Sequence, residues 1–204
     1  MHPPGPAPPK FSAAYVPPHA KFAYLEPFGP EHVDRVWRAG VVCGRHMNCA
    51  GGSWSRGALH ERALVARADH SRAGGDADGM HWVAYSAARA PIALTSIYRP
   101  PGTHTYVHRA YFAPATPRET MSGVVAAALD AFHRTAGHDY AVVTADCFRS
   151  DASEVFEAAG YVPVLHGKMV RKTRVNGRSS GRVCDVLVCV SPAARRAARP
   201  SYGA

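Results

Sequence analysis

The sequence predicts an α/β protein in which helices cover the faces of a mixed central sheet. Apolar residues recur at helical spacing in the segment 117–136, where Met121, Val125 and Phe132 fall on one face. Short runs rich in β-branched and aromatic residues, each of strand length, lie on both sides of that segment. The 204 residues are enough for one domain with a substantial core.

Turn residues divide the chain into elements in order. The expected strands are 22–25, 81–87, 92–98, 104–112, 140–145, 161–171 and 183–190, and the expected helices are 30–39, 58–70, 117–136 and 150–159. Pro30 suits the first position of a helix, and Gly160 suits the residue after a helix end. The turn Arg89–Pro91 joins two strands into a hairpin. Segment 140–145 is apolar throughout, which is typical of a strand buried on both faces.

The two ends of the chain differ in composition from its centre. Residues 1–20 are rich in proline, so we expect a disordered leader, and residues 192–204 form an expected basic, flexible tail. Between them, 21–191 is expected to be a single domain. No apolar run reaches bilayer-spanning length, so we expect no membrane partner. Five cysteines without an apolar signal segment favour reduced thiols in a cytoplasmic protein.

The chain is strongly basic, with a formal net charge of +9 in which arginine dominates. Arginine binds phosphate groups through planar, bidentate hydrogen bonds, so double-stranded DNA is a candidate partner. The last two strands flank a basic loop, KTRVNGRSSGR, with an Asn-Gly turn, which would contact a DNA backbone. The equal alternatives are a solvated hairpin and an arginine content set by a GC-rich genome.

The long helix begins with a distinctive set of residues. Thr116 and Glu119 fit a capping box with Pro117 at the first helical position. A helix start also attracts anions through its unpaired amides. Glu119 would repel a phosphate there, whereas Arg118 would attract one. A well-capped helix and a phosphate site both fit these residues.

These motifs resemble the GNAT superfamily of acyltransferases. Arg118 and Gly123 match the family's phosphate-binding turn, although Met121 replaces its middle glycine, and Ala152, Phe156 and Gly160-Tyr161 match its downstream run. The resemblance implies a mostly antiparallel central sheet and an acyl-CoA or acetyl-CoA donor. It implies that the donor is held at Phe112, Ala113, Arg118, Met121, Gly123 and Arg149. Arg149 stands where the family has Asn. Phe156 stands where many members carry a tyrosine that reprotonates the leaving thiolate, and Phe has no hydroxyl.

A narrower resemblance is to the phage Mom-like branch, which modifies adenine in DNA in the host cytosol. It rests on Arg109-Ala-Tyr-Phe, on Pro117-Arg118 followed by Ser122, and on Asp146 at the end of a strand. It implies catalytic roles for Asp146, Ser122 and Arg109. Each has a structural alternative: a capping carboxylate, a hydroxyl bonded to its own helix, and a solvated strand arginine.

Cys43, His46 and Cys49 are spaced at intervals of three in a Gly-rich segment. Thiolate and imidazole are ligands that suit zinc or iron, and Mom-like proteins are associated with iron. His46 is therefore a candidate metal ligand, with an ordinary loop as the alternative.

Three functions fit the sequence: a Mom-like enzyme that modifies a DNA base, a CoA-dependent N-acyltransferase that acts on a small amine or a protein amine, and a catalytically silent protein that binds nucleic acid or another partner. All depend on one spatial expectation. The start of the long helix and the end of strand 140–145 should open into a shared crevice, with Arg118, Ser122 and Asp146 around it.

Overall fold

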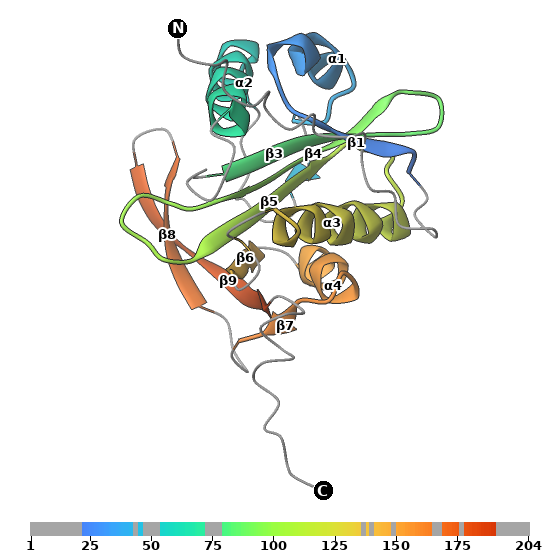
Figure 1. Ribbon diagram of the computed structural model, residues 1–204. Coiled ribbons are helices and arrows are strands. Elements are labelled where there is room, and N and C mark those ends of the chain that lie inside the picture. Colours follow the sequence, from blue (N-terminus) through green and yellow to red (C-terminus); the bar gives the residue numbers. More distant parts are fainter. Residues whose placement is uncertain are drawn as a thin grey trace, which may run out of the picture.

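The computed structural model (Figure 1) describes residues 22–42, 45–46, 54–71, 79–135, 138, 141–147, 150–164, 169–175 and 178–190. The expected leader 1–20 and tail 192–204 lie outside these residues. So do Arg149, Cys43 and Cys49, for which the sequence predicts a donor contact and metal ligands.

The centre of the molecule is a mixed sheet. Its strands are β1 (Tyr24–Pro27), β2 (Arg45–His46), β3 (Gly79–Tyr85), β4 (Pro91–Tyr98), β5 (Tyr106–Phe112), β6 (Val142–Cys147), β7 (Val162–Pro163), β8 (Met169–Val175) and β9 (Arg178–Val190). The order across the sheet is β1-β3-β4-β5-β6-β9-β7, while β2 pairs with β5 and β8 with β9. Among the described strands, only β5 and β6 pair in parallel, and every other pair is antiparallel. The predicted mixed, mostly antiparallel sheet is confirmed.

Helices cover both faces of this sheet. A short 3-10 turn, Pro30–His32, leads into α1 (Val33–Arg38), which is followed by α2 (Arg56–Ser71), α3 (Arg118–His133) and α4 (Ser150–Ala158). In Figure 1, α1 and α2 lie above β3 and β4, whereas α3 and α4 lie below these two strands. None of the described helices is both long and apolar enough to cross a membrane.

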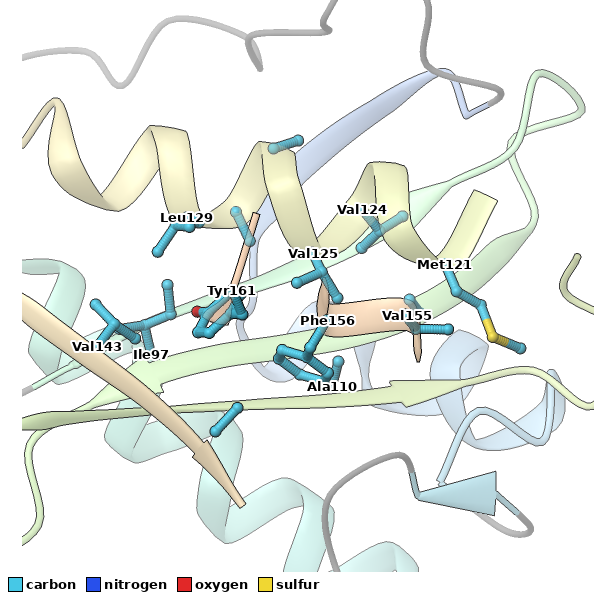
Figure 2. Packing of buried hydrophobic residues seen from close by; sticks show 14 of the residues in the cluster. Ile97, Ala110, Met121, Val124, Val125, Leu129, Val143, Val155, Phe156 and Tyr161 are labelled. Atoms are coloured by element: carbon cyan, nitrogen blue, oxygen red, sulfur yellow. The ribbon is translucent and has the colours of Figure 1, made fainter. Parts of the chain in front are cut away.

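Two apolar cores result, one on each face. The α3/α4 core joins strand residues such as Trp82, Ile97 and Phe112 to α3 and α4. Figure 2 shows this core, with Phe156 and Val155 of α4 beneath Val125 and Met121 of α3. The α1/α2 core takes the alternate strand residues, including Val83, Leu94 and Tyr111. The central strands β3, β4 and β5 therefore contribute to both cores, because successive side chains on a strand point to opposite faces.

Strand β6 differs from the expectation that it is buried on both faces. Val143, Ala145 and Cys147 are buried in the α3/α4 core, whereas Thr144 and Asp146 are only half-buried. The reason is that α1 and α2 pack against β3 and β4, farther along the sheet. A strand with an apolar sequence can therefore still have one face that is only partly buried.

The basic segment near the C-terminus is also different from the expectation. It was expected as a loop, but β8 continues to Val175 and β9 begins at Arg178, so nearly all of it is strand. The two strands pair along their length, with Val175 opposite Arg178 and Met169 opposite Cys184. Together they form a two-stranded ribbon beyond the sheet (Figure 1).

The predicted capping box at the start of α3 is wrong. The helix begins at Arg118 after Pro117, and no side chain caps it. Instead, the Thr116 hydroxyl donates a hydrogen bond to the Ile92 carbonyl oxygen at 3.3 Å, and the Ala113 N–H donates to the same oxygen at 2.9 Å. These bonds tie the β5–α3 connection to β4, which takes Thr116 out of its expected role.

The end of α4 confirms the role predicted for Gly160. Its φ of +95° is in the left-handed region that favours glycine, and an added Cβ there would meet nothing within 4 Å. We expect Gly160→Ala to lower the free energy of unfolding by about 1 kcal/mol, through backbone strain alone.

The matched control is Gly57→Ala in the first turn of α2, where glycine has no such conformation. That change is expected to raise the free energy of unfolding by about 0.5–1 kcal/mol. Urea unfolding measures both. Equal effects of the two changes would contradict the conformational argument.

Candidate functional site

The sheet opens between β5 and β6. These strands pair at only two positions, Tyr106 with Val143 and Val107 with Thr144. Beyond them β6 stays paired with β9 along its whole length, and β5 stays paired with β4. At its far end β5 also pairs with β2, where Arg45 lies opposite Phe112. Past these two positions β5 and β6 are not paired, and α3 begins just after the unpaired end of β5.

The start of α3 exposes one positive charge. Arg118 forms an ion pair with Glu154 of α4, and both side chains are more than half exposed. The Ser122 hydroxyl donates to the Glu119 carbonyl oxygen at 3.1 Å, which is the bond within the helix that the sequence left as an alternative. Met121 turns into the α3/α4 core (Figure 2), so its side chain does not cover the first-turn amides.

Three other residues that were expected to hold the acyl donor are occupied by contacts within the fold or have no special geometry. Phe112 is completely buried, and Ala113 uses its N–H in the bond to Ile92. A Cβ at Gly123 would meet only the Phe22 ring at 3.8 Å, an ordinary contact, so no close approach requires this glycine. Arg118 and the first turn of α3 are thus the described groups best placed to attract an anion.

Asp146 and Arg109 lie on the opposite face of the sheet from Arg118 and Ser122. Their strand neighbours Ala145 and Ala110 belong to the α3/α4 core, and side chains alternate along a regular strand. The expected crevice around Arg118, Ser122 and Asp146 is therefore divided by the sheet. Between these two faces, the sheet is interrupted where β5 and β6 are no longer paired.

A row of polar residues crosses the sheet on the Arg109 side. His81, Ser96 and Arg109 are direct cross-strand neighbours on β3, β4 and β5. His81 Nδ1 lies 2.8 Å from Ser96 Oγ, and the Asp69 carboxylate of α2 lies 3.5 Å from His81 Nε2. Burial lowers the pKa of His81, and Arg62 lowers it further, against the opposing effect of Asp69. His81 is therefore neutral at neutral pH.

Two arginines meet over one aromatic ring beside this row. The Cζ atoms of Arg62 and Arg109 lie 5.0 Å and 5.3 Å from the centroid of the Tyr98 ring. Arg62 Cζ also lies 5.7 Å from the Trp54 ring centroid. All four side chains are half-buried. We call Arg62, Tyr98, Arg109 and Trp54 the Tyr98 cluster.

A second polar group is enclosed in the α3/α4 core. His108 lies 2.7 Å from Thr95 Oγ1 through Nε2 and 2.7 Å from the Tyr161 hydroxyl through Nδ1. Burial lowers the pKa of His108 to about 3 and raises that of Tyr161 well above its usual value. Phe156 is fully buried against both rings. The position where many GNAT proteins carry tyrosine is here part of the core.

Sequence reasoning missed Asp69, His81, Ser96 and Arg62. The available signal was a polar residue inside an apolar strand: His81 and Ser96 each interrupt such a run. Their register across the sheet could not be seen in the sequence. For the metal, no group of three or more His, Cys, Asp or Glu side chains in the described ranges is placed to hold a metal ion. His46 is described only as part of β2, so the zinc or iron site remains a prediction.

Comparisons with known proteins show which fold the chain shares. No protein-family model matches the sequence, and no curated protein matches it. Solved structures do match it. An N-acetyltransferase from Staphylococcus aureus Mu50 is similar with a TM-score of 0.61 and 8% identity, over 81% of this chain and 96% of that one. The chain has the fold of the GNAT superfamily.

Among the similar structures are spermidine N-acetyltransferases. A SpeG chimera from Vibrio cholerae and hSSAT matches with a TM-score of 0.60 and 14% identity, over 88% of this chain and all of that one. Spermidine N-acetyltransferase from Vibrio cholerae, in complex with CoA and spermine, matches with a TM-score of 0.58 and 13% identity, over 86% and 98%. These similarities give no support to Mom-like DNA modification, which remains a prediction from the sequence.

Proposed function

We propose that the protein is a CoA-dependent N-acyltransferase that acts on a small amine. The observation that carries this proposal is the parting of β5 and β6. On the α3 face of the sheet lies the exposed start of α3 with Arg118. On the other face lies the half-buried Arg109 of β5, with Ser96 and His81 buried beside it on β4 and β3. A donor and an acceptor can approach such an opening from opposite faces of the sheet.

On the donor side, Arg118 and the first-turn amides of α3 would bind the diphosphate of acyl-CoA. When bound, acyl-CoA supplies an acyl thioester, which an amine nitrogen attacks with release of the thiol. On the acceptor side, the amine proton would pass through the Ser96 hydroxyl to neutral His81; both side chains are buried, so the acceptor would have to displace the groups that cover Ser96. Asp69 holds the His81 ring and stabilises the charge that this proton brings. Phe156 takes no part in proton transfer.

Arg118 and Glu154 provide a matched test of the donor site. Arg118→Gln is expected to weaken CoA binding by about tenfold, because a charge-assisted bond to phosphate is lost. Glu154→Gln removes the competing carboxylate and keeps the cation, so it is expected to leave the affinity unchanged or to raise it. Isothermal titration with CoA and with acetyl-CoA measures both changes.

Wild-type protein at an acetyl-CoA concentration of 100 times Kd is expected to gain about 2.7 kcal/mol of stability. Release of free thiol from acetyl-CoA in the presence of amines then tests turnover. Absence of a melting shift at saturating acetyl-CoA would overturn the proposal. If both variants weakened CoA binding equally, the diphosphate would not be bound by Arg118.

A further inference from the structure

We propose that the basic ribbon, formed by β8 and residues 178–184 of β9, binds double-stranded DNA in the major groove. This inference is independent of the proposed acyltransferase function and concerns a different part of the molecule. The ribbon lies beyond the central sheet (Figure 1), and β8 pairs with no described strand other than β9. The proposal gives a partner to a basic segment that the acyltransferase function leaves unexplained.

The first reason is the charge of the ribbon. Residues 168–182 contain six of the chain's 24 Lys and Arg residues and no Asp or Glu, so this short segment holds two thirds of the formal net charge of +9. The next acidic residue along the chain, Asp185, accepts a hydrogen bond from the Ser153 hydroxyl of α4 at 2.9 Å. The ribbon therefore has no acidic residue of its own to balance its charge, and it suits a polyanion.

The second reason is the register of the two strands. Arg171 lies directly opposite Arg182, Thr173 lies opposite Ser180, and Arg178 follows two positions before Ser180 on β9. Because positions alternate between the two faces of a ribbon, these five residues belong to one face. That face carries three arginines with two hydroxyl residues between them. Like charges directly opposite each other destabilise a strand pair, and a bound phosphate offsets that repulsion.

The spacing on this face matches the DNA major groove. Arg178 and Arg182 are four residues apart on β9, which is roughly 13 Å along a strand. The major groove of B-DNA is about 12 Å wide and accepts a two-stranded ribbon. Arginines at the two ends would bind phosphates on opposite sides of the groove, with Thr173 and Ser180 over the base edges between them. Hydroxyl groups bond to several bases, so we expect little sequence preference.

The composition of the ribbon argues against other polyanions. Single-stranded nucleic acid is bound by stacking on aromatic side chains, and residues 168–184 include no Phe, Tyr or Trp. The same residues include no Leu or Ile, so the large apolar anchors of a membrane-surface segment are missing. The major groove of double-stranded RNA is too deep and narrow for side chains to read. Duplex DNA is therefore the polyanion that fits.

The test measures binding of the full chain, without CoA, to a fluorescein-labelled DNA duplex of about 20 base pairs by fluorescence anisotropy. Three arginine–phosphate contacts predict a slope of about −3 for the logarithm of the binding constant against the logarithm of the KCl concentration. Affinity is then expected to fall roughly 40-fold between 50 and 200 mM KCl. Duplex RNA and single-stranded DNA of the same length are expected to bind at least about fivefold more weakly.

Two double variants with the same change of charge separate the faces of the ribbon. Arg171→Gln/Arg182→Gln is expected to weaken DNA binding at least about tenfold at 50 mM KCl and to reduce the salt slope by about 2. Lys172→Gln/Arg174→Gln changes two residues that the register places on the opposite face, and it is expected to weaken binding less than about threefold.

Arg38→Gln/Arg89→Gln, at exposed positions in α1 and in the turn between β3 and β4, is the control away from the ribbon and should keep wild-type affinity. Circular dichroism checks that each variant folds. If Arg171→Gln/Arg182→Gln does not, the wild-type salt slope and the comparison of DNA with RNA still decide.

Three outcomes would overturn the inference: equal losses in the two ribbon variants, duplex RNA bound as tightly as duplex DNA, or no DNA binding at 50 mM KCl. Thiol release from acetyl-CoA enters none of them. DNA binding and the acyltransferase function can therefore fail separately.

Discussion

Replacing Phe156 with alanine is expected to lower the free energy of unfolding by about 3–5 kcal/mol. The side chain is fully buried in the α3/α4 core, with its ring centroid 5.3 Å from that of His108 and 5.1 Å from that of Tyr161 (Figure 2). Truncation leaves a cavity under α3 and removes both ring contacts. Urea unfolding followed by circular dichroism measures the loss.

Leu64→Ala on α2 is the matched control, because that side chain is 51% exposed and its loss should change stability by less than about 0.5 kcal/mol. A loss below about 1 kcal/mol for Phe156→Ala would mean that this ring faces an open site. The result therefore also decides whether the position can take part in chemistry.

Acidification from pH 7 to pH 4 is expected to destabilise the protein by roughly 3 kcal/mol through His108 alone. Burial lowers the pKa of His108 from 6.5 to about 3 in the folded state. The unfolded chain takes up a proton below pH 6.5 that the folded protein does not accept. The stabilisation is complete above that pH and is lost as the pH falls toward 3.

The measurement is the free energy of unfolding in urea at intervals between pH 7 and pH 4, for wild type and His108→Gln. The variant is expected to show a slope smaller by about 1.4 kcal/mol per pH unit between pH 6 and pH 4. His60→Gln, at an exposed position of α2, should keep the wild-type slope. His81, whose pKa is also lowered, contributes slope in the same direction to all three proteins. Identical slopes for wild type and His108→Gln would contradict the burial of an uncharged imidazole.

Most of the fold could be predicted because it depends on local periodicity. The helical spacing of Met121, Val125 and Phe132 gave α3, and the left-handed turn at Gly160 was expected from its place after α4. The errors have tertiary causes. The basic segment is strand because it pairs with β9. Thr116 does not cap α3 because its hydroxyl donates a hydrogen bond to the Ile92 carbonyl oxygen.

The candidate site was harder to predict because it is assembled across the sheet. Arg118 was found through a motif that is contiguous in the sequence. His81, Ser96 and Arg109 are brought together only by the register of three strands, and Arg62 joins them from α2. The sequence contains each residue, but no local rule states which strand is the neighbour or which face a helix covers.

Strand β9 connects the basic ribbon to the central sheet. Its first half forms the basic ribbon with β8, and its second half is bonded to β6, with no loop between the two halves. At Asp185, where the strand enters the sheet, the carboxylate accepts a hydrogen bond from Ser153 of α4 at 2.9 Å. Strand β9 and this hydrogen bond therefore join the outer ribbon to the helix that carries Glu154, the ion-pair partner of Arg118.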